Sequence, residues 1–247
     1  MTALSAAGDE VHVWWASLSA TDEELARLVP LLSPDERLRS ARYLIPEVKR
    51  RFIVGRATLR MLLGRYLGVD APGVELEYGH AGKPRLRASL GSDLTFNLAH
   101  SHQHAALAFC RKTEIGIDIE RVDPSIDTTA IVWTMFPASE RERHRALPEA
   151  DKRLAFYLAW TRREAYLKGE GCGLTGSLAE VDVTGADGSR RFAAAGPGRA
   201  RGWSVEDLPV DEGWVGAVAV QRSEWQLRIS RWHRPARHCT DPQARTL

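Results

Sequence analysis

The 247-residue chain is long enough for one large domain or two lobes, and its 44% hydrophobic residues can build a substantial core. Its 34 basic and 32 acidic residues give a net charge of +2, which argues against wholesale nucleic-acid binding. Cys110, Cys172 and Cys239 have no C-x-x-C spacing, which argues against a disulfide framework or a zinc ribbon. We find no signal peptide and no apolar run of membrane-spanning length, so we expect a soluble, cytoplasmic protein without a membrane partner.

One strand and three helices are predicted for the first part of the chain. The stretch "EVHVWWASL" (residues 10–18) is rich in β-branched and aromatic residues, as strands are. Residues 21–32 and 33–44 each begin with a helix-capping signal, and the second has Ser33 as N-cap and Pro34 at the first helical position. A long helix is predicted from about Pro46 to Tyr66. Its polar face carries five basic residues: Lys49, Arg50, Arg51, Arg56 and Arg60.

The stretch "EIGIDIE" (residues 114–120) reads as a strand with two different faces. Alternation puts three isoleucines on one face and Gly116, Asp118 and Glu120 on the other. A strand with one dry and one wet face would give this pattern without any function. Two carboxylates at i and i+2 can also converge on a hard cation such as Mg²⁺, so the strand is a candidate metal site.

The neighbours of this strand are predicted from a hairpin. Residues 105–110 ("AALAFC") and 115–120 are expected to pair around a turn near Lys112 and Thr113. That pairing would bring the segment from His100 to His104 beside the carboxylate end of the strand. The preceding segment "EYGHAGKPRL" is predicted to be a loop, followed by the strand "LTFNLAH".

The second part of the chain predicts another strand–helix–strand arrangement. Residues 121–136 are interpreted as an apolar loop, "SERERHRAL" and residues 149–171 as helices, and residues 178–231 as short strands. The order strands, helices, strands thus occurs twice, with the break near residue 112. We predict an α+β fold with two lobes, residues 1–112 on the nucleotide-binding side and 113–232 with the catalytic carboxylates, followed by a flexible tail at 233–247.

Glu164 and Lys168 lie four residues apart on the long second helix, with Trp160 one turn earlier. Such a pair is most often an ordinary exposed ion pair. Here the surrounding "WTRREAYLKGEG" combines carboxylates with several cations, which is the combination that phosphoryl transfer requires.

Four motifs in this order, "GKP", "FNLAHS", "GIDIE" and "WTRREAYLK", resemble those of the 4′-phosphopantetheinyl transferases of the surfactin-synthetase-activating (Sfp) type. The resemblance runs from about Val11 to Val220. It implies two similar lobes related by a pseudo-two-fold axis, with coenzyme A and Mg²⁺, or Mn²⁺, between them. It also implies transfer of the phosphopantetheine arm to a serine of an apo acyl, peptidyl or aryl carrier protein, releasing adenosine 3′,5′-bisphosphate. Because both lobes are in one chain, a monomer is expected.

The same resemblance assigns the catalytic residues. Asp118, Glu120 and Glu164 would hold the metal, and Glu164 is also the candidate general base for the serine hydroxyl. Lys168 would contact the phosphate under attack, so Asp118, Glu164 and Lys168 form the expected catalytic set.

The expected coenzyme A ligands lie mainly in the first lobe. Lys83 and Pro84 of "GKP" would meet the nucleotide end, and Arg51 and His100 the 3′-phosphate. Lys168 would complete the phosphate contacts.

Three positions depart from the family pattern. Ala99 replaces a usual serine, and Ser101 is the nearest hydroxyl that could take over its contact to phosphate. Arg163 replaces a usual lysine and is included among the expected coenzyme A ligands. Glu36 stands where a basic residue is common.

Two alternatives from other functional classes remain open. His100, His102 and His104 form an H-x-H-x-H pattern that could hold zinc or iron in a different metal-dependent enzyme. The basic helix face could also serve a non-enzymatic module that docks an acidic carrier protein. Such a module would tolerate loss of the three carboxylates, whereas the transferase would not.

Overall fold

The computed structural model describes residues 4–79, 82–171, 181, 183, 191–194 and 202–235. The first half contains three α-helices and five strands: β1 (Glu10–Ser17), α1 (Asp22–Leu28), α2 (Pro34–Ala41), α3 (Pro46–Leu67), β2 (Leu76–Tyr78), β3 (Pro84–Leu86), β4 (Leu94–Ser101) and β5 (His104–Arg111). The second half contains the remaining elements: β6 (Ile115–Arg121), α4 (Thr128–Met135), α5 (Ala138–Ala146), α6 (Glu149–Glu170), β7 (Arg191–Ala194), β8 (Trp203–Asp207), β9 (Trp214–Val220) and β10 (Gln226–Trp232). The α+β class is therefore confirmed.

Local sequence signals account for the helix boundaries of the first half. Thr21 and Ser33 each form a capping box with the glutamate three residues later, which satisfies two free backbone N–H groups at each helix start. A short 3₁₀ turn containing Pro30 follows α1, because proline cannot donate the next helical hydrogen bond. Helix α3 ends at Gly68, whose φ of 72° is accessible to glycine at little cost. The helix starts match the predicted ones, whereas α1 and α2 end at Leu28 and Ala41, before the predicted residues 32 and 44.

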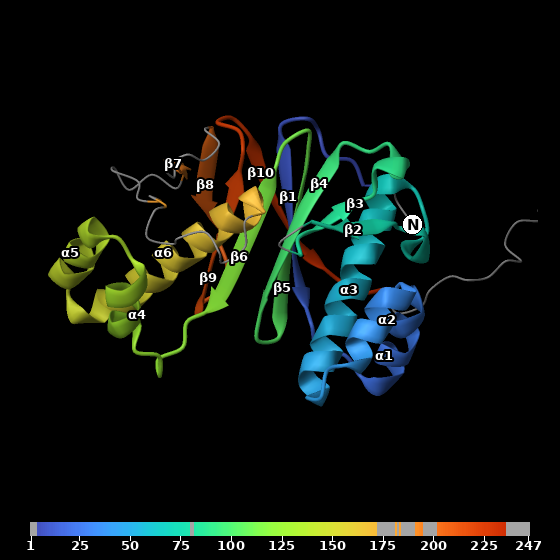
Figure 1. Cartoon of the computed structure of the whole chain (residues 1–247), viewed down its shortest axis with the longest axis horizontal. Coiled ribbons are helices and arrows are strands. Elements are labelled where there is room, and N and C mark those ends of the chain that lie inside the picture. The colour runs from blue at the N-terminus through green and yellow to red at the C-terminus, as the bar shows by residue number, and fades with distance from the viewer. Residues whose placement is uncertain are drawn as a thin grey trace, which may run out of the picture.

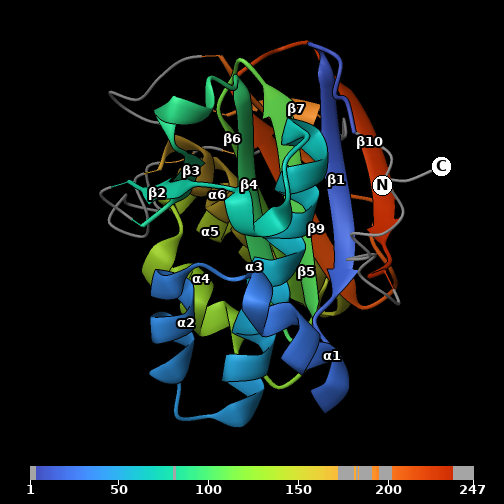
Figure 2. The same ribbon diagram turned by 90° about the vertical axis from the view of Figure 1, so that its right-hand side faces the viewer.

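Two four-stranded sheets form the frame of the molecule. One has the strand order β10-β1-β5-β4 and the other β6-β9-β8-β7. We call the first sheet with α1, α2 and α3 the N-lobe, and the second with α4, α5 and α6 the C-lobe. The sheets stand side by side with α3 on one flank and α6 on the other (Figure 1). Seen from the N-lobe side, α3 lies across its sheet (Figure 2).

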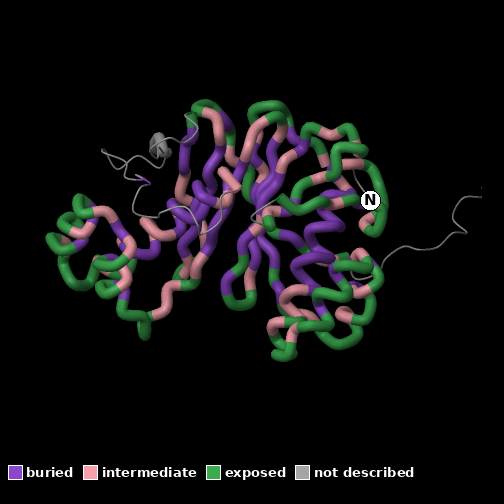
Figure 3. The backbone as a smooth tube through the Cα atoms, viewed as in Figure 1, coloured by how far each residue is buried: buried purple, intermediate pink, exposed green. Residues whose placement is uncertain are grey.

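The strands β4 and β6 are the facing edges of the two sheets. A side chain of β4 takes the place of a strand partner here, because Asn97 Oδ1 accepts a hydrogen bond from the backbone N–H of Ile117 at 3.0 Å. The three isoleucines of β6 are buried in a core shared with β1 and β5. Buried backbone accordingly follows the central strands and the inner faces of α3 and α6, while α4 and α5 are largely exposed (Figure 3).

Three predicted features differ from the structure. The hairpin between residues 105–110 and 115–120 is wrong, since β5 pairs with β4 and β1, and β6 pairs with β9. The segment 121–136 contains helix α4 as well as a loop, and the loop before β4 contains the short β2–β3 pair. The lobe boundaries stay a prediction, but β10, placed beyond residue 113, pairs in parallel with β1 of the N-lobe.

Within the predicted tail, residues 236–247 lie outside the described part of the chain. Every helix among the described residues is too short or too polar to serve as a membrane span.

Candidate active site

Strand β6 and helix α6 approach each other at two glycines. A Cβ placed on Gly116 would lie 1.9 Å from the carbonyl oxygen of Ala165 and 2.3 Å from the backbone nitrogen of Gly169, so only glycine fits. Gly116, Asp118 and Glu120 share the face of β6 that meets α6. The close backbone contact therefore brings the two carboxylates of β6 beside Glu164 and Lys168 of α6.

Lys168 is the cation of this cluster. Its Nζ donates a hydrogen bond to Asp118 Oδ1 at 2.5 Å. The second oxygen, Asp118 Oδ2, and Glu164 Oε1 are buried, and neither has a hydrogen-bond partner among the described residues. Buried carboxylate oxygens are normally hydrogen-bonded, so two such oxygens on carboxylates that repel each other call for a further positive group or donor.

Burial raises the pKa of all three carboxyl groups, and that of Asp118 reaches about 6. Lys168 acts in the opposite direction on each of them. Each carboxylate also feels a like charge, since Glu120 raises the pKa of Asp118, Glu164 that of Glu120, and Asp118 that of Glu164. Three mutually repelling carboxylates thus share one ammonium group.

Glu120 is held from the N-lobe. Ser101, at the end of β4, donates its hydroxyl to Glu120 Oε2 at 2.7 Å and accepts a hydrogen bond from the backbone N–H of Arg121. Its hydroxyl is thus engaged in orienting a carboxylate. The predicted neighbourhood of β4 and the carboxylates is correct, but it arises between sheet edges and not within a hairpin. Ala99 is buried in the core between the sheets.

A group of cations lies around His100. His100 is exposed, and partial loss of hydration around its ring lowers its pKa. The charges of Lys168, Arg51 and Arg56 act in the same direction. Arg51 donates to the carbonyl oxygen of His102 at 3.2 Å, which places its guanidinium at the end of the β4 strand.

Arg56 is a candidate ligand that the sequence analysis did not single out. The residue is 9% exposed, and its Nη1 is buried with no hydrogen-bond partner among the described residues. Its guanidinium lies 5.6 Å from the ring centre of Phe52 and 5.7 Å from that of Tyr78. By contrast Arg60, on the same predicted basic face, is buried in an ion pair with Glu36 at 2.6 Å. Their shared basic pattern gave no means of telling the free guanidinium from the paired one.

Lys83 and Pro84 lie where the N-lobe meets the catalytic elements. The Lys83 ammonium donates to Glu114 Oε2, to the Ile115 carbonyl oxygen and to the Gly169 carbonyl oxygen, at 2.9, 3.1 and 2.8 Å. Desolvation lowers the pKa of Lys83, while Glu114 raises it. Pro84 is buried at the start of β3.

The placement of Arg163 is at odds with its predicted role as a coenzyme A ligand. Its side chain is 0% exposed, so no ligand can reach it in this conformation. The guanidinium forms an ion pair with Glu140, donates to the carbonyl oxygens of Ala159 and Val181, and stacks on Phe136 at 4.3 Å. Arg163 therefore packs the inside of the C-lobe, and we withdraw it from the candidate ligands.

The three histidines do not converge. His104 stacks on Trp15 at 5.2 Å between ring centres, and His102 lies in the turn after β4 with a φ of 49°. His100 faces the cations described above. Among the described residues, no three His, Cys, Asp or Glu side chains are arranged to ligate one metal ion as they stand.

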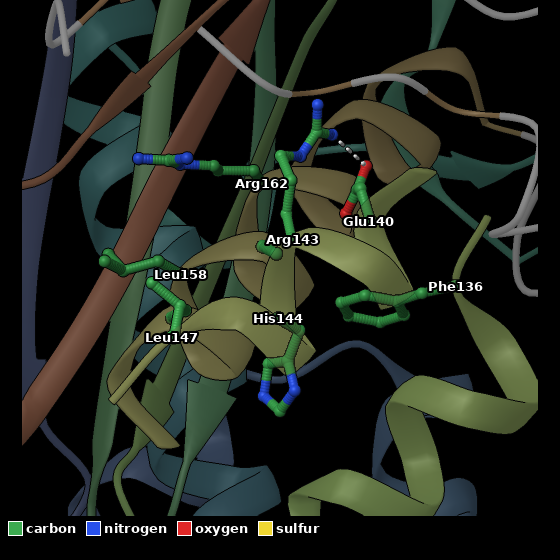
Figure 4. A pocket seen from close by; sticks show the side chains of 9 residues that line it. Phe136, Glu140, Arg143, His144, Leu147, Leu158 and Arg162 are labelled. Carbon is green, nitrogen blue, oxygen red and sulfur yellow. Dashed lines mark ion pairs between the residues drawn. The ribbon is translucent and has the colours of Figure 1, made fainter. Parts of the chain in front are cut away.

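A separate cavity of about 210 Å³ lies between α5 and α6 (Figure 4). It is lined mainly by apolar side chains, with Arg143, His144 and Arg162 at its border. Arg162 precedes Glu164 by two positions, which corresponds to about 200° around a helix. This cavity therefore opens on the other side of α6 from the carboxylate cluster.

Comparisons with known proteins agree with this geometry. Residues 15–112 match the model described as "4′-phosphopantetheinyl transferase, N-terminal", and residues 114–219 match the 4′-phosphopantetheinyl transferase superfamily. The chain is 37% identical over 231 residues to the 4′-phosphopantetheinyl transferase HetI of Nostoc sp., covering 93% of this chain and 94% of the relative. It is 28% identical over 163 residues to the 4′-phosphopantetheinyl transferase Sfp of Bacillus subtilis, covering 66% and 70%. The chain belongs to the 4′-phosphopantetheinyl transferase family.

Proposed function

We propose that this protein is a Mg²⁺-dependent holo-carrier-protein synthase. It transfers the 4′-phosphopantetheine arm of coenzyme A to a serine of an apo acyl, peptidyl or aryl carrier protein. The observation that carries the proposal is the pair of buried, unpartnered oxygens of Asp118 and Glu164 beside Lys168. The two lobes within one chain support a monomer. Action in the cytoplasm stays a prediction from the sequence.

The residues present fit a divalent cation. Asp118, Glu120 and Glu164 supply oxygen donors only, which Mg²⁺ prefers over Zn²⁺-type nitrogen and sulfur ligands; Mn²⁺ accepts the same donors. When ionised, they carry three negative charges against the single charge of Lys168, so a divalent ion would balance the cluster. Asp118 and Glu164 would hold the ion through their unpartnered oxygens, with Glu120 oriented by Ser101. The ion, when bound, supplies positive charge for the pyrophosphate of coenzyme A.

Glu164 and Lys168 would carry the remaining chemistry. The serine oxygen forms a bond to the phosphorus that bears the pantetheine arm, and the bond from that phosphorus to adenosine 3′,5′-bisphosphate breaks. Glu164 takes the serine proton, and burial helps because it raises the pKa of this carboxyl and makes it a stronger base. Lys168, whose side chain is 32% exposed, can turn its remaining N–H donors to the phosphate.

Arg51, Arg56 and His100 would bind the 3′-phosphate of coenzyme A. Arg56 contributes most to this proposal, because its buried guanidinium has a free donor and no carboxylate partner among the described residues. Two aromatic rings already hold it in place, so little side-chain freedom is lost when phosphate binds. Pro84 shapes the nearby nucleotide-binding segment.

A comparison of coenzyme A with dephospho-coenzyme A distinguishes the loss of this phosphate contact from a general loss of protein structure. Arg56→Ala is expected to raise the KM for coenzyme A about 10-fold to 100-fold, the loss of one charge-assisted hydrogen bond to phosphate. The KM for dephospho-coenzyme A, which lacks the 3′-phosphate, should change about 3-fold or less. Arg50→Ala is the control on the same helix, because Arg50 is more exposed, with 36% of its side chain accessible, and forms an ion pair with Asp22. Equal effects of Arg56→Ala on both substrates would contradict the assignment.

The reaction itself is tested by its small product. The protein is incubated with coenzyme A, MgCl₂ and an apo carrier protein, and adenosine 3′,5′-bisphosphate is measured by liquid chromatography. Release should require the carrier and stop when EDTA removes the metal. A docking module without catalysis would bind the carrier but release no nucleotide. Release that continues without the carrier would point to hydrolysis of coenzyme A and contradict transfer.

A further inference from the structure

We propose that Lys83 is a positioning residue that holds β6 and α6 in catalytic alignment, and that its ammonium group does not bind coenzyme A. The proposal rests on the proposed function for its kinetic consequence, but its structural part stands independently. It reassigns a residue that the sequence places among the coenzyme A ligands.

The ammonium group of Lys83 has no donor left for a ligand. An ammonium carries three N–H donors. All three are used, on Glu114 Oε2, the Ile115 carbonyl oxygen and the Gly169 carbonyl oxygen. The side chain is 8% exposed. Binding a phosphate would therefore require breaking at least one of these buried contacts, and the orphaned carbonyl oxygen would then lack a partner.

The two carbonyl oxygens belong to the two catalytic elements. Ile115 begins β6, three residues before Asp118, and Gly169 directly follows Lys168 in the last turn of α6. The last carbonyl groups of a helix have no partner within the helix, and a cation there is favourable. One ammonium thus caps the C-terminal end of α6 and attaches it to the first residue of β6.

The alignment that Lys83 maintains is the one that the active site needs. Lys168 reaches Asp118 at 2.5 Å, and the glycine at position 116 lets the backbones of β6 and α6 come close enough for this contact. The glycine contact sets how close the two elements lie. It does not by itself prevent α6 from sliding along the strand, whereas hydrogen bonds from one atom to both elements do. Loss of Lys83 should therefore loosen the carboxylate cluster without removing any group from it.

Arg85 provides a matched control. It also bonds to Glu114, through Nη1 to Oε1 at 2.9 Å, but its side chain is 47% exposed, and among the described residues it forms no hydrogen bond to Ile115 or Gly169. Lys83→Met removes the ammonium and keeps a long side chain, and Arg85→Met makes the same kind of change at the control position. Each variant is compared with the wild-type full-length protein in steady-state transfer to an apo carrier protein.

Lys83→Met is expected to lower kcat about 10-fold or more and to raise the Mg²⁺ concentration for half-maximal rate several-fold, because the ligands are less well ordered. The KM for coenzyme A should stay within about 2-fold, and Arg85→Met should match the wild type in all three quantities. Lys83→Arg, which keeps charge and donors, should recover part of the kcat. A rise of about 10-fold in the KM for coenzyme A with unchanged kcat would show that Lys83 is a ligand and overturn the proposal.

Hydrogen–deuterium exchange tests the structural part without any activity. Peptides from the start of β6 and from the last turn of α6 should exchange faster in Lys83→Met than in the wild type. In Arg85→Met, the exchange rates of the same peptides should equal those of the wild type. Lys83→Gln, which also removes the ammonium group, serves for the same comparison if Lys83→Met does not fold. Unchanged exchange in both peptides would overturn the proposal. If the wild type transfers nothing, the proposed function fails, and the exchange result still decides the role of Lys83.

Discussion

Replacing Asp118 by asparagine is expected to lower the rate of transfer about 1000-fold or more. The substitution keeps the size of the side chain but removes its negative charge. In the wild type, one oxygen of this carboxylate contacts Lys168, and the other has no partner among the described residues and is free for the metal. An amide is a much weaker ligand for Mg²⁺ than a carboxylate, and the cluster would lose one of the three charges that attract the ion. Glu164→Gln should give a comparable loss, because it removes the proposed base as well as a metal ligand.

Folding of these variants can be separated from catalysis. Metal-free Asp118→Asn protein should unfold at a temperature no lower than metal-free wild type, because the substitution removes one of three repelling buried carboxylates. Asp123, which is partly exposed on the following segment, is the control, and Asp123→Asn should retain transfer. Retention of more than about a tenth of the wild-type rate by Asp118→Asn would contradict its role as a metal ligand.

The same carboxylate predicts a pH dependence. Burial raises the pKa of Asp118 to about 6 in the metal-free protein, above its usual 3.8. A proton therefore competes with the metal below about pH 6. The Mg²⁺ concentration for half-maximal rate should rise as the pH is lowered through this range. The stability of the metal-free fold changes in the opposite direction. Because the pKa of Asp118 is higher in the folded protein than in the unfolded chain, the free energy of unfolding increases as the pH falls toward 4.

Gly116→Ala is expected to destabilise the protein by more than about 4 kcal/mol. The added Cβ would lie 1.9 Å from the Ala165 carbonyl oxygen, and this atom belongs to the backbone of α6, which cannot move aside as a flexible side chain can. Either α6 is pushed away from β6 or the variant does not fold. Any folded variant should also lose transfer, because Glu164 and Lys168 would leave their positions beside Asp118.

Denaturant unfolding of both proteins measures this effect. Gly55→Ala is the control, since a Cβ at Gly55 in α3 would make only an ordinary contact of 3.6 Å with Leu18. Alanine is favoured over glycine inside a helix by about 1 kcal/mol, so this control should equal or exceed the wild type in stability. A Gly116→Ala protein within about 1 kcal/mol of the wild type would show that β6 and α6 are not packed as described.

Local signals predicted the elements of this fold better than its pairings. Capping boxes at Thr21 and Ser33 and the alternation in β6 depend on residues close in sequence, and they were read correctly. The β5–β6 hairpin failed because β6 pairs with β9, about a hundred residues away, and no local pattern encodes that choice. Helix α4 was missed because its apolar residues show no clear helical period.

The site shows the same division. The face of β6 and the spacing of Glu164 and Lys168 place carboxylates and cation on predictable faces. Which cation is free depends on packing: Arg163 and Arg56 are both buried arginines, yet one is bound to Glu140 and the other keeps an unpartnered donor. The three bonds of Lys83 likewise join residues from three separate segments, so the sequence alone could not predict them.

The most direct test of metal-dependent transfer is the intact mass of an apo carrier protein after incubation with this protein, coenzyme A and MgCl₂. We predict a mass gain of one phosphopantetheine group, absent with EDTA and absent when the acceptor serine of the carrier is alanine. No gain with acyl, peptidyl and aryl carrier proteins, under conditions where a known transferase modifies each of them, would contradict the proposed function.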